Sequence, residues 1–102
     1  MTEFQKLVRD KIPDIIRKQG ETAHIRILED TEYRQALENK LNEEVAEFYE
    51  SKTLEELADV LEVVYALAES QGASVQDLLK VYEKKHSERG GFSKKIFLIA
   101  KE

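Results

Sequence analysis

The chain has 102 residues, enough for one small domain over residues 1–102, and 36% of them are charged while 41% are hydrophobic. It contains no cysteine, which excludes disulfides and thiolate metal sites, and no apolar run approaches the roughly 20 residues of a membrane span. The formal net charge of −5 argues against stable nucleic-acid binding, and without an apolar signal segment at its start we expect a cytoplasmic protein with no membrane partner.

The first third of the chain predicts one short helix and one extended segment. The helix covers about residues 9–19, with Pro13 in its first turn, where a missing N–H matters little, and Gly20 at its end. The stretch "TAHIRILED" that follows is rich in β-branched residues. It leaves open a short strand near residues 23–28, which could pair with the apolar run near residues 95–100.

Three longer helices are predicted over about residues 30–50, 53–70 and 74–89. The second of these opens on a capping box from Thr53 to Glu56, and the third begins at Ser74, a good N-cap. We therefore expect an all-α fold: a compact four-helix-type bundle with a short N-terminal helix and three longer ones.

The helix over residues 30–50 carries acidic residues at positions that should face a neighbour. Its apolar stripe consists of Leu37, Leu41, Val45 and Phe48. Glu44 interrupts this stripe and Glu47 flanks it, whereas Glu43 lies farther round the helix and should be solvated.

The helix over residues 53–70 repeats this pattern. Glu56 falls in the same arc as Val60 and Val63, and Asp59 stands at the edge of that arc. The apolar arc covers more than half of the helix circumference, more than one neighbouring helix can cover in so short a chain. We therefore expect a second copy of the chain to cover the remainder.

A tight turn at residues 51–52 sets the register of the two helices. An antiparallel hairpin around it places Glu47 level with Glu56 and Glu44 level with Asp59. Four converging carboxylates raise one another's pKa and need protons, basic side chains or cations to neutralise them. Oxygen ligands without cysteine suit Mg²⁺, with Mn²⁺ as an option. The alternatives are that Glu56 serves only as a capping residue and that Glu44 and Glu47 lie on the surface.

The helix over residues 74–89 adds basic residues to the pattern. Lys85 and Arg89 continue the apolar face that Leu78 and Tyr82 mark. Three interpretations stay open: a phosphate clamp, a buried ion pair with the carboxylates, or a helix end with Arg89 in water.

These motifs resemble a known family. Glu43-Glu44-x-x-Glu47 followed by Glu56-x-x-Asp59 is similar to the signature of the MazG-like all-α nucleoside triphosphate pyrophosphohydrolases. The opening "KLVRDKIPDII" and the closing "KKHSERGGFSKKIFL" resemble its small phosphoribosyl-ATP pyrophosphohydrolase-like branch. The spacing between the two acidic motifs is shorter than in many members.

The resemblance implies Mg²⁺-dependent cleavage of a nucleoside triphosphate between the α and β phosphates by a homodimer or homotetramer. It implies metal ligands at Glu44, Glu47, Glu56 and Asp59, and phosphate contacts at Lys85 and Arg89. Either Glu47 or Glu43 could activate the attacking water. Two alternatives remain: a phosphoribosyl-ATP substrate in histidine biosynthesis, or a helical interaction module whose acidic residues are only structural.

Overall fold

The computed structural model describes residues 5–102, and this part of the chain is all-α, with four helices and no strand. The helices are α1 (Ile12–Lys18), α2 (Asp30–Ser51), α3 (Leu54–Ser70) and α4 (Val75–Arg89). The predicted fold class and the order of the helices are confirmed. The first helix is shorter than expected, because Lys11 is its N-cap and the residues before it are not helical.

Local capping explains where α3 and α4 begin. The hydroxyl of Thr53 accepts a hydrogen bond from the backbone N–H of Glu56, and Ser74 and Asp77 form a complete capping box at the start of α4. Between α2 and α3, Lys52 adopts a left-handed conformation with φ 56°, and its N–H donates to the Phe48 carbonyl. This turn closes the α2–α3 hairpin within two residues.

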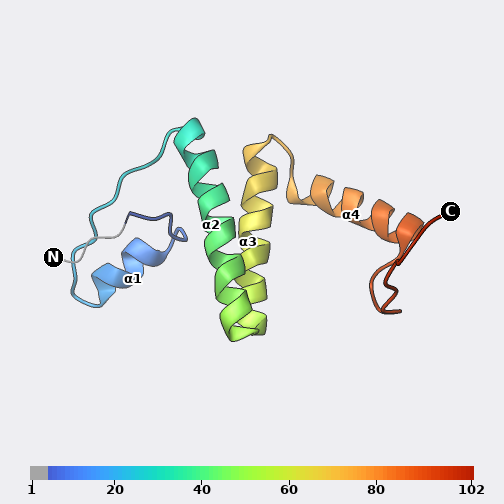
Figure 1. Cartoon of the computed structure of the whole chain (residues 1–102). Coiled ribbons are helices and arrows are strands. Elements are labelled where there is room, and N and C mark those ends of the chain that lie inside the picture. Colours follow the sequence, from blue (N-terminus) through green and yellow to red (C-terminus); the bar gives the residue numbers. More distant parts are fainter. Residues whose placement is uncertain (1–4) are drawn as a thin grey trace.

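The α2–α3 hairpin is the centre of the structure (Figure 1). Its two helices lie antiparallel along their length, α1 lies on the α2 side, and α4 runs outward from the end of α3. In the described residues, the buried apolar side chains are Leu37 on α2 and Val63 on α3. The hairpin interface is therefore the only place where this chain buries a core of its own within residues 5–102.

The arrangement is more extended than the compact bundle that the sequence predicted. The radius of gyration is 17.9 Å, whereas a compact chain of about 100 residues has about 13 Å. The apolar face of α4 stays open, since Leu79 and Tyr82 are 40% and 53% exposed. This chain therefore covers that face only in part, because α4 runs outward from the hairpin.

The optional short strands do not form in the described residues. Residues 21–29 and 96–102 have no regular secondary structure, and they lie on opposite sides of the hairpin (Figure 1). Extended segments so far apart cannot pair, and β-branched residues alone do not make a strand without a partner. No helix within residues 5–102 is both long and apolar enough to cross a membrane.

Candidate functional site

Carboxylates from α2 and α3 converge in the seam of the hairpin. Two groups have carboxylate oxygens that lie within 4.8 Å of one another, and both groups contain Glu44. One group runs along α2 and joins Glu43, Glu44 and Glu47. The other crosses the seam and joins Glu44 to Glu56 and Asp59 of α3.

The predicted set of four carboxylates is thus brought together around Glu44. The sequence-based register paired Glu44 with Asp59, and these two residues do share a group. It also paired Glu47 with Glu56, whereas the structure places Glu47 with its neighbours on α2. We name the five residues Glu43, Glu44, Glu47, Glu56 and Asp59 the acidic cluster.

Glu44 is the buried member of the acidic cluster, with only 6% of its surface exposed. Its position on the apolar stripe of α2 turns it toward α3, as the helical periodicity predicted. Burial is the main cause that raises the pKa of Glu44, and the nearby Glu47 carboxyl raises it further, whereas Lys40 lowers it. These surroundings therefore disfavour the ionised form of Glu44 unless a further cation lies nearby.

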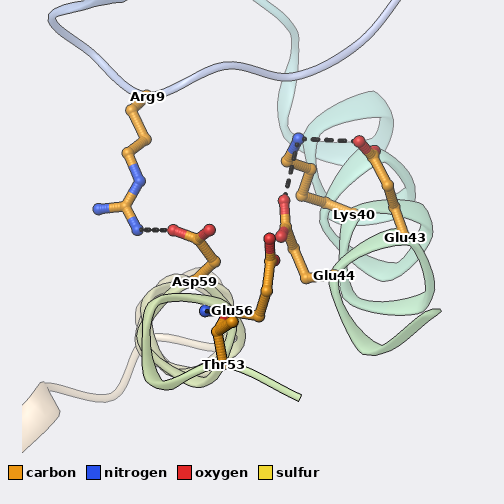
Figure 2. A network of polar contacts seen from close by, with 7 residues as sticks. All are labelled: Arg9, Lys40, Glu43, Glu44, Thr53, Glu56 and Asp59. Carbon is orange, nitrogen blue, oxygen red and sulfur yellow. Dashed lines mark hydrogen bonds and ion pairs between the residues drawn. The ribbon is translucent and has the colours of Figure 1, made fainter. Parts of the chain in front are cut away.

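Two carboxylate oxygens in the seam lack a partner. Within the described residues, Oε2 of Glu44 and Oε2 of Glu56 are buried and accept no hydrogen bond. Figure 2 shows these two side chains reaching toward each other from α2 and α3. At the start of α3, the Thr53 hydroxyl accepts from the Glu56 N–H, but the Glu56 carboxyl accepts no hydrogen bond from the Thr53 N–H. Glu56 therefore does not complete a capping box. The alternative that Glu56 serves only as a capping residue therefore does not account for its buried carboxyl.

Two basic side chains border the acidic cluster, and sequence reasoning assigned neither of them to it. Lys40 Nζ lies 3.4 Å from an oxygen of Glu43 and 3.4 Å from an oxygen of Glu44. Arg9 Nη2 donates to Asp59 Oδ1 at 2.7 Å (Figure 2). The i, i+4 spacing from Lys40 to Glu44 could have been read from the sequence, but no local signal joins residues 50 positions apart.

Lys85 and Arg89 do not reach the acidic cluster in this chain. Both side chains are exposed on α4, the helix that runs away from the hairpin (Figure 1). Neither forms an ion pair with a carboxylate of the cluster in the described part of the molecule. The interpretation of these two residues as buried counter-ions of the cluster within one chain is therefore wrong.

The composition of the acidic cluster suits a hard divalent cation. All five side chains offer only carboxylate oxygens, which Mg²⁺ and Mn²⁺ prefer over the nitrogen and sulfur ligands typical of zinc. The two unpartnered oxygens of Glu44 and Glu56 are positions where a cation would supply the missing interaction. The residues present therefore fit such an ion.

Comparisons with known proteins give a partial similarity. A 48-residue stretch is 54% identical to an uncharacterized protein of Mycolicibacterium smegmatis, and it makes up 47% of this chain and 49% of that protein. The chain thus matches about half the length of this relative. No protein-family model matches the sequence, and no solved structure matches it.

Proposed function

We propose that the acidic cluster binds Mg²⁺ and that the protein hydrolyses a nucleoside triphosphate between its α and β phosphates, releasing a nucleoside monophosphate and pyrophosphate. The observation that carries the proposal is the buried Glu44 carboxylate, whose Oε2 has no partner among the described residues and lies where carboxylates from two helices meet. The resemblance of the two acidic motifs and of both chain ends to the MazG-like pyrophosphohydrolases supports it.

The residues are assigned two roles by position, and Glu47 is a candidate for both. Glu44, Glu56 and Asp59 span the seam and hold the cation together with Glu47, and Mn²⁺ can replace Mg²⁺ in such an oxygen site. A bound divalent cation would neutralise charge on the phosphates. Glu43 and Glu47 are half-buried beside Glu44, where either carboxylate could orient a water and accept its proton.

The proposal includes a second copy of the chain. Leu54, Leu57 and Leu61 recur at i, i+3 and i+7 on α3 and are 78%, 45% and 47% exposed. Together with the open face of α4, they form apolar surface that a homodimer or homotetramer would cover. In such an assembly Lys85 and Arg89 could contact phosphates at the acidic cluster of a neighbouring subunit, since they lie away from the cluster of their own chain.

A non-catalytic interaction module is the second candidate, and the ion pairs of Lys40 and Arg9 favour it. In that case the two cations neutralise the acidic cluster permanently, and the cluster has no ligand. Calorimetry separates the two candidates, because a metal site binds Mg²⁺ and a salt-bridged seam does not.

The activity is tested by incubating the protein with Mg²⁺ and a panel of canonical and modified nucleoside triphosphates, together with phosphoribosyl-ATP, and measuring pyrophosphate release. We expect release from at least one nucleoside triphosphate and none from the Glu44→Gln variant. A protein that binds no Mg²⁺ at millimolar concentrations would refute the proposal. Selective turnover of phosphoribosyl-ATP would keep the reaction and change the substrate.

A further inference from the structure

Arg9 reaches the acidic cluster from outside the hairpin. It lies in the non-helical segment before α1, and its guanidinium crosses to α3 to donate to Asp59. The side chains of Arg9 and Asp59 are 55% and 38% exposed, so the pair stands at the open edge of the cluster. Figure 2 shows Arg9 extending from its loop toward Asp59, on the side opposite Lys40.

Arg9 and Lys40 border the acidic cluster in different ways. Lys40 is on α2 itself, its side chain is only 19% exposed, and it bridges two carboxylates of the same helix. Arg9 uses one terminal nitrogen to contact one oxygen of one carboxylate. A guanidinium has five N–H donors arranged in a planar fork, so this bond occupies a small part of its capacity. Lys40 is thus a fixed counter-ion, whereas the fork of Arg9 can accommodate a further anion.

The chemistry of the guanidinium indicates which anion would bind. Arginine forms two parallel hydrogen bonds with phosphate as it does with carboxylate, and it stays charged at every relevant pH. A cation held by Asp59 competes with Arg9 for the same carboxylate and repels the guanidinium. Phosphate drawn to the cluster by that cation then offers Arg9 a new partner beside its present one.

We propose that Arg9 binds the phosphate chain of the substrate when the acidic cluster holds its cation, and that Asp59 holds the guanidinium in place before the cation arrives. This inference rests on the proposed function. It assigns to the segment before α1 a role in substrate binding. It also supplies, within one chain, a phosphate contact that Lys85 and Arg89 of the same chain are too distant to make.

Binding measurements on the full chain test the role of Arg9 without relying on turnover. The probes are Mg²⁺ alone and the magnesium complex of inorganic triphosphate, which carries a phosphate chain without a base. The variants are Arg9→Ala, Arg9→Lys and the control Arg26→Ala. Arg26 also lies in a non-helical segment and pairs with a single carboxylate, Glu32, at 2.9 Å.

Arg9→Ala is expected to bind Mg²⁺ as tightly as the wild type or more tightly, because a competing cation has been removed. The same variant should bind magnesium triphosphate roughly ten- to hundredfold more weakly, which is the range for loss of a charge-assisted contact. Arg9→Lys should recover part of this loss, since it restores the charge without the fork. Arg26→Ala should match the wild type with both probes.

The outcomes separate this inference from the proposed function. If the wild type binds no Mg²⁺, the proposed function fails and the role of Arg9 fails with it. If the wild type binds both probes and Arg9→Ala retains full triphosphate affinity, the role of Arg9 alone is overturned. A large drop in the melting temperature of Arg9→Ala, with unchanged triphosphate affinity in the folded fraction, would likewise assign Arg9 to structure, because exposed ion pairs ordinarily contribute little to stability.

Discussion

Replacement of Glu44 by glutamine is the sharpest test of the seam between α2 and α3. The substitution keeps the shape of the side chain and removes one negative charge from a residue that is 6% exposed. Because burial and Glu47 raise the pKa of Glu44, the surroundings of this side chain favour its neutral form. The new amide could also donate a hydrogen bond to Oε2 of Glu56, which now lacks a partner.

The change in stability that Glu44→Gln causes is the sum of opposing effects. Glutamine relieves the desolvated charge and the repulsion by Glu47, but it loses the attraction of Lys40 at 3.4 Å. We expect the metal-free variant to be as stable as the wild type or more stable by about 1 kcal/mol, the usual net contribution of one added hydrogen bond. For a domain of this size, that gain would raise the melting temperature by roughly 4–8 °C.

The raised pKa of Glu44 determines how the stability of the metal-free protein changes with pH. The pKa of Glu44 in the folded protein lies above its ordinary value of 4.5, so the folded state binds more protons than the unfolded state between these two values. The metal-free wild type should therefore lose stability as the pH rises from about 4.5 through the folded-state pKa of Glu44. The Glu44→Gln variant should show a flatter profile in this window.

The assay is urea unfolding in the presence of a chelator, across this pH range, beside calorimetric titration with Mg²⁺. Loss of a residue that only supports a metal ligand typically weakens metal binding 10- to 100-fold. If Glu44 is itself a ligand, as the proposed function has it, Glu44→Gln should weaken Mg²⁺ binding by at least about 100-fold. Glu62→Gln, on the exposed side of α3, is the matched control and should leave both measurements unchanged. If Glu44→Gln unfolds without metal, or binds Mg²⁺ normally, the metal assignment of Glu44 is wrong.

Three further predictions concern the same surfaces. Mg²⁺ should stabilise the wild type, by about 2.7 kcal/mol at a concentration 100 times its Kd, and a thermal scan of Glu44→Gln should show no such gain. Lys40→Met should destabilise the metal-free protein at neutral pH by roughly 1–3 kcal/mol, because Glu43 and Glu44 lose their shared cation. The same variant should bind Mg²⁺ more tightly, and unchanged unfolding curves would contradict the expected loss of stability. Light scattering at micromolar concentration should report at least a dimer, since apolar residues of α3 and α4 are left exposed, and a stable monomer would overturn the assembly.

Much of the fold could be predicted because its determinants are local. The N-caps Thr53 and Ser74 accept hydrogen bonds from the backbone three residues on, as their sequence patterns indicated. The inward position of Glu44 followed from the 3.6-residue period of its helix and was confirmed by its burial. The length of the turn then sufficed to bring carboxylates of α2 and α3 into one seam.

The rest depended on where distant segments lie. The apolar stripe of α4 indicates that this face avoids water, but a stripe does not specify whether the same chain or another one covers it. The contact between Arg9 and Asp59 joins residues 50 positions apart. Arg9 lies in a non-helical segment that has no periodic pattern, so the sequence did not predict this contact. The sequence pattern therefore found the carboxylates of the acidic cluster and missed Arg9 and Lys40 at its border.

The energetics of the hairpin connect the acidic cluster to the stability of the fold. Within residues 5–102, the buried side chains are those of Leu37, Val63 and Glu44, so a carboxylate occupies one of very few core positions. An apolar residue there would stabilise the isolated hairpin, since it would remove a desolvated charge and an unpartnered oxygen. A ligand that binds Glu44 together with Glu56 and Asp59 would reverse this penalty and also tie α2 to α3. The same burial that disfavours the ionised Glu44 carboxylate would thus strengthen its binding to a cation.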